Sequence, residues 1–349
     1  MSLPAASGYR MPAEWAPHAA TWLSWPRPEG ISFPGGETDA DAIWGRLASL
    51  LAQEEAVHIN VFSPVHRQAV EAALRQWAPA PRHPVILHQF PAYEPWCRDH
   101  GPIFIQNAAG TAVVDWDYNA WGGKYPPYDF DDAVPRHVAD YLDMPLFSPG
   151  LVMEGGSLDV DGEGTLLTTE SCLLNPNRNP GKSREEIEAA LRGYLGVEKI
   201  LWLGDGILGD DTDGHVDDLT RFVSPGVVVT VVERDPADEN YKPLLENRRR
   251  LETMTDARGR SLRVIDLPMP APLVQDGQRL PASYANFYIA NNQVLVPVFG
   301  DPQDDVACSI LAPLFPGRRI VPFAARELIW GLGALHCITQ QQPLFWKSV

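Results

Sequence analysis

Several short stretches of this sequence place ionisable side chains beside apolar ones, where they could face a cleft. In residues 94–102, Asp99 stands where a strand is expected to begin, so that its carboxylate could point into such a cleft. In residues 152–157, Glu154 ends an apolar run, and the two glycines after it allow a backbone to approach a ligand closely. Taken singly, each stretch is better explained by an exposed turn.

The densest group of ionisable residues lies in residues 204–218, which hold six aspartates and one histidine. An EF-hand is excluded, because placing Gly214 at the invariant sixth position puts a glycine at the first ligand position and a threonine at the last. His215 and Asp217 are two residues apart, so on an extended chain they share one face. Such a pair serves either proton transfer or a divalent metal.

Near the C-terminus, Cys337 follows a histidine in a stretch that changes from apolar to polar. Most free cysteines are inert buried thiols, and the residues alone leave that interpretation open for Cys337. The other three cysteines, Cys97, Cys172 and Cys308, are expected to be structural thiols. No zinc-type spacing occurs, and four cysteines are too few for a disulfide scaffold.

The composition narrows the classes of protein to which these residues can belong. With 28 Lys plus Arg against 45 Asp plus Glu, the net charge is −17. Nucleic-acid binding needs Lys and Arg to neutralise phosphates, so this balance argues against it and suits small cationic ligands. No apolar run approaches the roughly 18 residues of a membrane span, and residues 1–18 lack the apolar core of a signal peptide. We therefore expect a cytoplasmic protein without a membrane partner.

Apolar periodicity alternates between short strands and amphipathic helices along the whole chain, which predicts an α/β fold. The clearest helix starts at Ser183 with a Ser183-x-x-Glu186 capping box, and Gly196 can end it. The other expected helices cover residues 41–56, 66–77, 133–142, 241–255 and 304–315. The expected strands cover residues 21–25, 57–63, 85–90, 102–106, 112–117, 151–153, 165–169, 200–203, 220–223, 227–233, 263–266, 287–290, 294–298 and 320–322.

No long linker interrupts this alternation, so we expect a single domain over residues 1–349. Strand–helix units recur about every 50–75 residues, which hints at a ring of similar modules. An open doubly wound sheet is equally compatible with the periodicity.

Four motifs in order resemble the agmatine deiminases, which are grouped with the bacterial-type peptidylarginine deiminases. They are Trp-x-Arg-Asp-x-Gly-Pro at 96–102, Glu-Gly-Gly-Ser at 154–157, Asp-Thr-Asp-Gly-His-x-Asp at 211–217 and His-Cys-Ile-Thr-Gln-Gln at 336–341. The stretches 119–128, 173–180 and 283–291 also look like this family. The likeness runs from about residue 11 to residue 343, and so many motifs in order are specific.

The resemblance implies a pentein fold, in which five ββαβ-type modules form a pseudo-fivefold propeller around a central channel. It implies hydrolysis of a guanidinium to a ureido group plus ammonia through a covalent amidino-thioether, without a cofactor or metal. Cys337 would be the nucleophile, His215 the general acid and base, and Glu154 its supporting acid. Asp99 and Asp217 would grip the guanidinium, since two carboxylates can fix a planar cation by bidentate hydrogen bonds.

The expected substrate is agmatine, because nothing in the sequence marks an arginine clamp for an α-carboxylate. Trp96, Trp121 and Tyr125 could line the channel against the substrate's methylene chain, although core packing explains them equally well. Glu94 could meet a distal amine. The resemblance also suggests homo-oligomers.

Three alternatives remain open at this point. A peptidylarginine or other guanidino-compound deiminase would use the same catalytic residues. A metal-dependent hydrolase could be built on the acidic stretch, with Asp211, Asp213, His215 and Asp217 as ligands. A third possibility is a non-catalytic protein that binds guanidines or polyamines.

Overall fold

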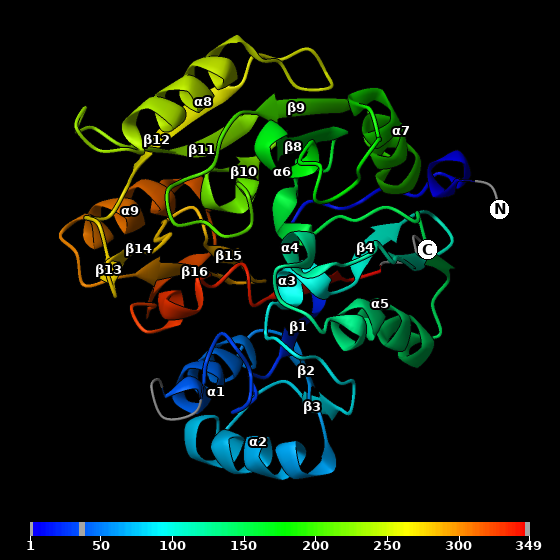
Figure 1. Ribbon diagram of the computed structural model, residues 1–349. Helices are drawn as coiled ribbons and strands as arrows, with labels where there is room; N and C mark the ends of the chain where they lie inside the picture. The colour runs from blue at the N-terminus through cyan, green and yellow to red at the C-terminus, as the bar shows by residue number, and fades with distance from the viewer. Residues whose placement is uncertain (1–2, 35–38, 346–349) are drawn as a thin grey trace.

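The computed structural model describes residues 3–34 and 39–345 (Figure 1). Four of its sheets have three strands each, and each sheet has the same order: two antiparallel strands, a helix, and a third strand parallel to the second. These modules are β4 (Ile103–Gln106), β5 (Thr111–Val114), α5 (Asp129–Leu142) and β6 (Leu146–Phe147); β7 (Asp159–Val160), β8 (Thr165–Thr169), α7 (Arg184–Leu195) and β9 (Lys199–Leu203); β10 (Thr220–Ser224), β11 (Val227–Val232), α8 (Tyr241–Thr253) and β12 (Arg263–Pro268); and β15 (Tyr288–Ile289), β16 (Gln293–Val298), α9 (Gln303–Leu311) and β17 (Arg319–Ala324).

The fifth module joins the two ends of the chain. Strand β18 (Gln340–Pro343) pairs antiparallel with β1 (His18–Ser24), and β1 pairs parallel with β2 (Ala56–Asn60) across α1 (Ala40–Leu51). A further helix, α2 (Pro64–Trp77), leads to β3 (Val85–His88), which extends this sheet. Figure 1 shows the five modules distributed around the middle of the molecule.

The α/β fold of five ββαβ-type modules is therefore confirmed, and the open doubly wound sheet is excluded. That the modules form one domain over residues 1–349 stays a prediction. None of the helices within residues 3–34 and 39–345 is both long and apolar enough to cross a membrane.

Local sequence explains why the elements form where they do. In α7 the predicted capping box is present: Ser183 Oγ accepts from Glu186 N, and the Glu186 carboxylate accepts from Ser183 N. Gly196 follows in the left-handed conformation, with φ of 67°, and ends the helix. Strand β11 is a run of valines and one threonine with both faces largely buried, as parallel strands under helices require.

Helix α1 and the expected strand 151–153 are among the elements that differ from the prediction. Helix α1 ends at Leu51 and not near residue 56, because the buried Glu55 beyond it accepts hydrogen bonds from His18 and Thr21 of β1. The expected strand 151–153 is a single bridge between Asp117 and Val152, since no neighbouring strand is long enough to extend the ladder.

The segment before the first strand of each module carries the polar motifs. These segments are α3 (Cys97–His100) before β4, η2 (Gly155–Ser157) before β7, η3 (Val216–Asp218) before β10, residues 283–287 before β15, and residues 335–339 before β18. Segment α3 contacts η2, and η2 contacts η3. Because the five modules share one topology, their equivalent ends meet in the middle of the molecule and build one site from five distant parts of the sequence.

Candidate active site

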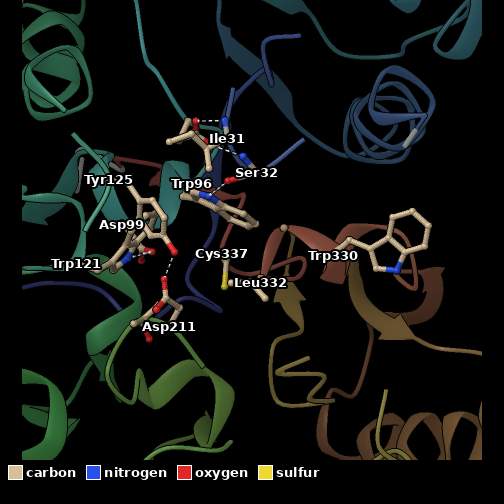
Figure 2. Close-up of a pocket in the computed structure, with 14 residues that line it drawn as sticks. Ile31, Ser32, Trp96, Asp99, Trp121, Tyr125, Asp211, Trp330, Leu332 and Cys337 are labelled. Atoms are coloured by element: carbon tan, nitrogen blue, oxygen red, sulfur yellow. Dashed lines mark hydrogen bonds between the residues drawn. The ribbon is translucent and has the colours of Figure 1, made fainter. Parts of the chain in front are cut away.

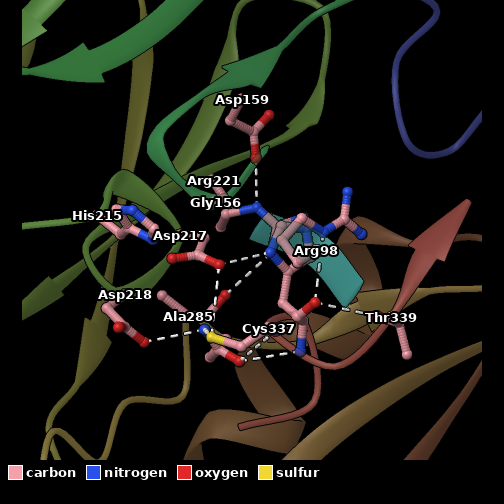
Figure 3. A network of polar contacts seen from close by, with 12 residues as sticks. Arg98, Gly156, Asp159, His215, Asp217, Asp218, Arg221, Ala285, Cys337 and Thr339 are labelled. Atoms are coloured by element: carbon pink, nitrogen blue, oxygen red, sulfur yellow. Dashed lines mark hydrogen bonds and ion pairs between the residues drawn. The ribbon is translucent and has the colours of Figure 1, made fainter. Parts of the chain in front are cut away.

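Cys337 lies in the segment before β18, buried among polar groups from the neighbouring modules (Figure 3). Asn286 Nδ2 donates a hydrogen bond to Cys337 Sγ at 3.1 Å, and the thiol donates to Asp217 Oδ2 at 3.8 Å. Burial, followed by the charges of Asp217, Asp218 and Asp99, raises the pKa of Cys337 well above its ordinary value. The sulfur is therefore a thiol and not a thiolate at neutral pH.

His215 is fully buried beside two carboxylates. Its Nδ1 lies 3.7 Å from Asp99 Oδ1 and its Nε2 lies 3.9 Å from Glu154 Oε2. Although burial lowers the pKa of His215, Asp99 and Glu154 raise it well above its ordinary value. The imidazole is therefore held in the protonated form, which can donate a proton to a leaving group.

Glu154 is itself charged because it is paired with an arginine. Arg178 Nε donates to Glu154 Oε1 at 2.6 Å, and neither side chain is exposed. Burial favours the neutral acid, but His215 and Arg178 outweigh it and lower the pKa of Glu154. Sequence reasoning gave Arg178 no role, although two buried acids beside a single histidine signal that a further cation is needed.

Asp99 is on the short helix α3, so the prediction that it begins a strand is wrong. The strand starts only at Ile103, because residues 97–100 close a helical turn. Trp121 Nε1 donates to Asp99 Oδ2 at 3.0 Å, and Gly156 N donates to Oδ1 at 3.1 Å. Burial raises the pKa of Asp99 to about 7.

Gly156 explains the paired glycines after Glu154. A Cβ at this position would lie 2.6 Å from His215 Nδ1 and 2.8 Å from Asp99 Oδ1. The glycine therefore lets the backbone approach these two side chains, whereas the sequence suggested approach to a ligand.

Asp217 lies on the 3-10 turn η3, so the prediction that His215 and Asp217 share a face of an extended chain is wrong. The turn places Asp217 next to a chain of buried polar side chains that sequence reasoning did not predict. His336 Nδ1 lies 2.7 Å from Asp217 Oδ2, and His336 Nε2 lies 2.7 Å from Glu14 Oε2. Burial raises and His336 lowers the pKa of Asp217, and the lowering prevails. Asp217 is thus a carboxylate, and its Oδ1 makes no hydrogen bond within the described residues.

A cavity of about 640 Å³, counting the part open to solvent, leads to these groups. Figure 2 shows the sulfur of Cys337 facing this cavity, with Trp96 and Asp211 on its walls. The residues that line it are Ile31, Ser32, Glu94, Trp96, Asp99, Trp121, Tyr125, Asp211, Thr212, Trp330, Gly331, Leu332, Gly333 and Cys337. The volume is typical of a small-molecule site.

Glu94 lines the cavity, but both of its carboxylate oxygens are already engaged. Oε1 accepts from Ile31 N at 2.8 Å and Oε2 accepts from Ser32 N at 3.1 Å. Asp211 is the other acid near the mouth, where it accepts from Tyr125 and lies 3.4 Å from Lys124 Nζ. Asp211 is about one-third exposed and so can meet a ligand.

The acidic stretch does not gather into the metal site that the sequence left open. Asp213 pairs with Arg178 at 2.6 Å and with Lys124 at 3.1 Å, so its charge is already matched. In the part of the chain that the structure describes, two groups have metal-type donors within 4.8 Å of one another: Glu154, Cys172 and His215; and Asp217, Asp218 and Cys337. Arg178 on the Glu154 carboxylate opposes a second cation in the first group.

Comparison with known proteins places this geometry in a family. The profile of the Porphyromonas-type peptidyl-arginine deiminases matches residues 10–343. A putative agmatine deiminase of Legionella pneumophila is 41% identical over 344 residues, covering 98% of this chain and 97% of that protein. The agmatine deiminase of Stutzerimonas stutzeri is 42% identical over 368 residues, with 98% and 97% covered.

Comparison with solved structures supports the same family. An agmatine deiminase of Enterococcus faecalis superposes with a TM-score of 0.91 at 37% identity, covering 98% of both chains. A substrate-bound agmatine deiminase of C. jejuni gives a TM-score of 0.86 at 28% identity, covering 96% of both. An amidinotransferase of Microseira wollei, at 12% identity and a TM-score of 0.53, shares the fold alone. Because the likeness spans nearly the whole chain in both sequence and structure, the chain belongs to the Porphyromonas-type peptidyl-arginine deiminase family.

Proposed function

We propose that this protein is an agmatine deiminase, which hydrolyses agmatine to N-carbamoylputrescine and ammonia. One observation carries the choice of substrate: the described residues that line the cavity include three carboxylic acids and no Lys, Arg or His. Agmatine is a dication with a guanidinium at one end and an ammonium at the other. A cavity with acids at its base and at its mouth attracts both ends.

The base of the cavity fits the guanidinium. Asp99 and Asp217 are buried carboxyl groups on two different modules, and among the residues that the structure describes none makes a hydrogen bond to Asp217 Oδ1. Their oxygens can accept the guanidinium N–H groups and hold its central carbon next to Cys337 Sγ. The arriving positive charge favours ionisation of both Asp99 and the thiol, whose pKa values are raised in the empty site.

The reaction then proceeds in two halves. Cys337 Sγ attacks the guanidinium carbon, and the C–N bond to a terminal nitrogen breaks as His215 donates a proton to the departing ammonia. A water molecule then attacks the amidino-thioether carbon, gives a proton to the now neutral His215, and displaces the cysteine sulfur. The carbon keeps the water oxygen as the ureido C=O, and the starting state of the enzyme is restored. Glu154 supports the cationic form of His215 throughout.

The mouth of the cavity discriminates between guanidino compounds. The α-carboxylate of free arginine would approach Asp211 and Glu94, and this like-charge encounter is unfavourable. The distal ammonium of agmatine has the opposite charge and favours Asp211. A peptidyl-arginine has neither group, so it would gain nothing from Asp211.

A substrate panel tests the proposal. Ammonia release should be fastest with agmatine, slower with butylguanidine, which lacks the distal amine, and slowest with free arginine, and Cys337→Ala should abolish it. In Asp211→Asn, kcat/KM for agmatine should fall about 5- to 10-fold, the size of a partly exposed charge pair worth about 1 kcal/mol, while that for butylguanidine should change less than about 2-fold. Asp205→Asn, an exposed acid of the same stretch, is the control.

Each competing function has its own signature in this panel. Preferred turnover of a blocked arginine peptide would assign peptidyl-arginine deimination instead. Binding of agmatine without ammonia release from any compound would indicate a non-catalytic protein. Equal losses for agmatine and butylguanidine in Asp211→Asn would refute the role of Asp211 at the mouth.

We further propose that the protein acts in the cytoplasm on a small cation, without nucleic acid or membrane partners and as a homo-oligomer. The net charge of −17 supports the choice of a cationic ligand over a polyanion. Fractionation and light scattering test the location and the oligomeric state.

A further inference from the structure

The catalytic histidine lacks the partners that usually orient an imidazole. Neither His215 ring nitrogen makes a hydrogen bond within residues 3–34 and 39–345, and the carboxylate oxygens nearest to them in ion-pair range stand 3.7 and 3.9 Å away. Glu154 Oε2, on the far side from Arg178, is also buried without a hydrogen bond. Buried polar atoms without a hydrogen bond are unfavourable, so a neighbouring group is needed to bond the ring nitrogens and this oxygen when the ring is charged.

The short helix α6 (Glu170–Leu173) packs against the loop that carries this histidine. Thr169, which caps the helix, donates from Oγ1 to Gly214 O at 2.6 Å. A Cβ on Gly214 would overlap Ser171 Oγ, so the helix and the loop are in close contact. Helix α6 therefore fixes the backbone immediately before His215.

The next residue of this helix, Cys172, reaches the ring itself. Its sulfur, a His215 ring nitrogen and a Glu154 carboxylate oxygen all lie within 4.8 Å of one another, and Cys172 is fully buried. Burial raises the pKa of Cys172, so the group is a neutral thiol. A neutral thiol can accept one hydrogen bond at sulfur and donate another from S–H.

We propose that Cys172 is a positioning residue for His215, which bridges the imidazolium and Glu154 by accepting a ring N–H and donating its S–H to Glu154 Oε2. The inference rests on the proposed function and deepens it. The bridge satisfies a ring nitrogen, the thiol and the free carboxylate oxygen together. It orients the ring through a neutral partner, which raises the pKa of the imidazolium less than a further carboxylate would.

A soft metal ion is a less suitable occupant of the same three side chains. Arg178 lies 2.6 Å from the Glu154 carboxylate and pairs with Asp213 as well, so a cation is already present. The thiol would also have to lose a proton that its burial retains.

The experiment compares Cys172→Ala with Cys172→Ser, using Cys308→Ala as a matched removal of a free cysteine far along the chain on α9. In Cys172→Ala, kcat for agmatine should fall about 10- to 100-fold, as for other groups that orient a catalytic ligand, and KM should change less than 2-fold. The basic limb of the pH profile should move to lower pH, because the ring loses a partner that stabilises its charge. Cys172→Ser should recover most of kcat and return the basic limb of the pH profile to its original pH, since the serine hydroxyl can donate and accept hydrogen bonds in the same way. Cys308→Ala should match the unmodified protein.

Two kinetic results would overturn the inference. One is an unchanged pH profile and kcat in Cys172→Ala. The other is an equal loss in the Ser and Ala variants that follows their unfolding temperatures, which would assign Cys172 to packing. The NMR titration of the His215 ring separates this inference from the proposed function, because it reads the ring's pKa whether or not agmatine is turned over. A ring pKa that is the same with and without the Cys172 thiol contradicts the bridge.

Discussion

The thiol of Cys337 should react much faster with a positively charged amidine than with a neutral amide of similar shape. In the empty site, burial and the charges of Asp217, Asp218 and Asp99 hold the pKa of this thiol well above its ordinary value. Only a small fraction of it is therefore thiolate at pH 7.5. An amidinium in the guanidinium position carries a positive charge that stabilises the thiolate. The charged reagent therefore promotes ionisation of the thiol that attacks it.

The size of the effect follows from the geometry. A unit positive charge about 4 Å from the sulfur stabilises the thiolate by about 4 kcal/mol at an effective dielectric constant of 20. This corresponds to about 3 pKa units, or a factor of up to about 1000 in the thiolate fraction. Asp99 gains part of the same stabilisation when it ionises, so we expect a rate ratio of at least about 100.

The assay follows inactivation and intact mass with 2-chloroacetamidine and 2-chloroacetamide at pH 7.5. Each rate is divided by the rate of the same reagent with glutathione, which removes the intrinsic difference in reactivity. Agmatine should protect, and Cys337→Ala should show only the background labelling of the half-buried Cys308. In Asp217→Asn, the ratio of the normalised rate with 2-chloroacetamidine to that with 2-chloroacetamide should be smaller. The reason is that the thiol then has one carboxylate fewer beside it, so the neutral reagent reacts with it more readily. A normalised ratio near 1 in the unmodified protein would refute the electrostatic argument.

Two further predictions concern stability. His58 Nδ1 lies 2.7 Å from His88 Nε2, and burial lowers the pKa of both histidines to about 4. The stability that they contribute is therefore full above pH 6.5 and is lost as the pH falls toward 4. Measured by urea unfolding, the free energy of unfolding should fall by about 2 kcal/mol for each histidine between pH 7 and 4.5. In a His88→Gln variant, the unfolding free energy should fall less over the same interval. The same pH dependence of the unfolding free energy in both proteins would contradict this prediction. Arg178→Met leaves Glu154 buried without its cation and should cost about 3 kcal/mol in unfolding free energy together with most of the activity. The exposed pair of Arg184 with Glu170 provides the control, because Arg184→Met should cost less than about 1 kcal/mol.

The strands and helices that sequence reasoning placed well are those whose pattern is local. The capping box of α7 and the apolar run of β11 specify their elements without help from the rest of the chain. Strand β18 was not predicted, because Gln340–Pro343 has no apolar alternation. It is a strand because β1, more than 300 residues earlier, offers it a partner edge. Periodicity could not give the closure of the ring for the same reason, and only the family resemblance implied it.

In the site as well, the sequence predicts some residues and misses others. The motifs single out the residues proposed to act on the substrate, because a nucleophile, an acid–base group and carboxylates are distinctive by type. They do not show the residues that hold these groups, such as Arg178, His336 and Asn286. Those side chains come from other modules, and their roles depend on contacts that form only when the modules meet. What the sequence does signal is that so many buried acids require buried cations somewhere in the fold.

The arrangement of charge also accounts for release of the product. Burial raises the pKa of Asp99 and of Asp218 and so favours their neutral forms, whereas an arriving cation favours their ionisation. Deimination converts the guanidinium into a neutral ureido group at the same position. The carboxyl groups that attracted the substrate then gain no Coulomb energy from the product, and Asp99 and the thiol return to their protonated forms. The site thus binds the charged end of the substrate more strongly than the neutral end of the product, and the chemical step itself removes the main attraction that would retain the product at the base of the cavity.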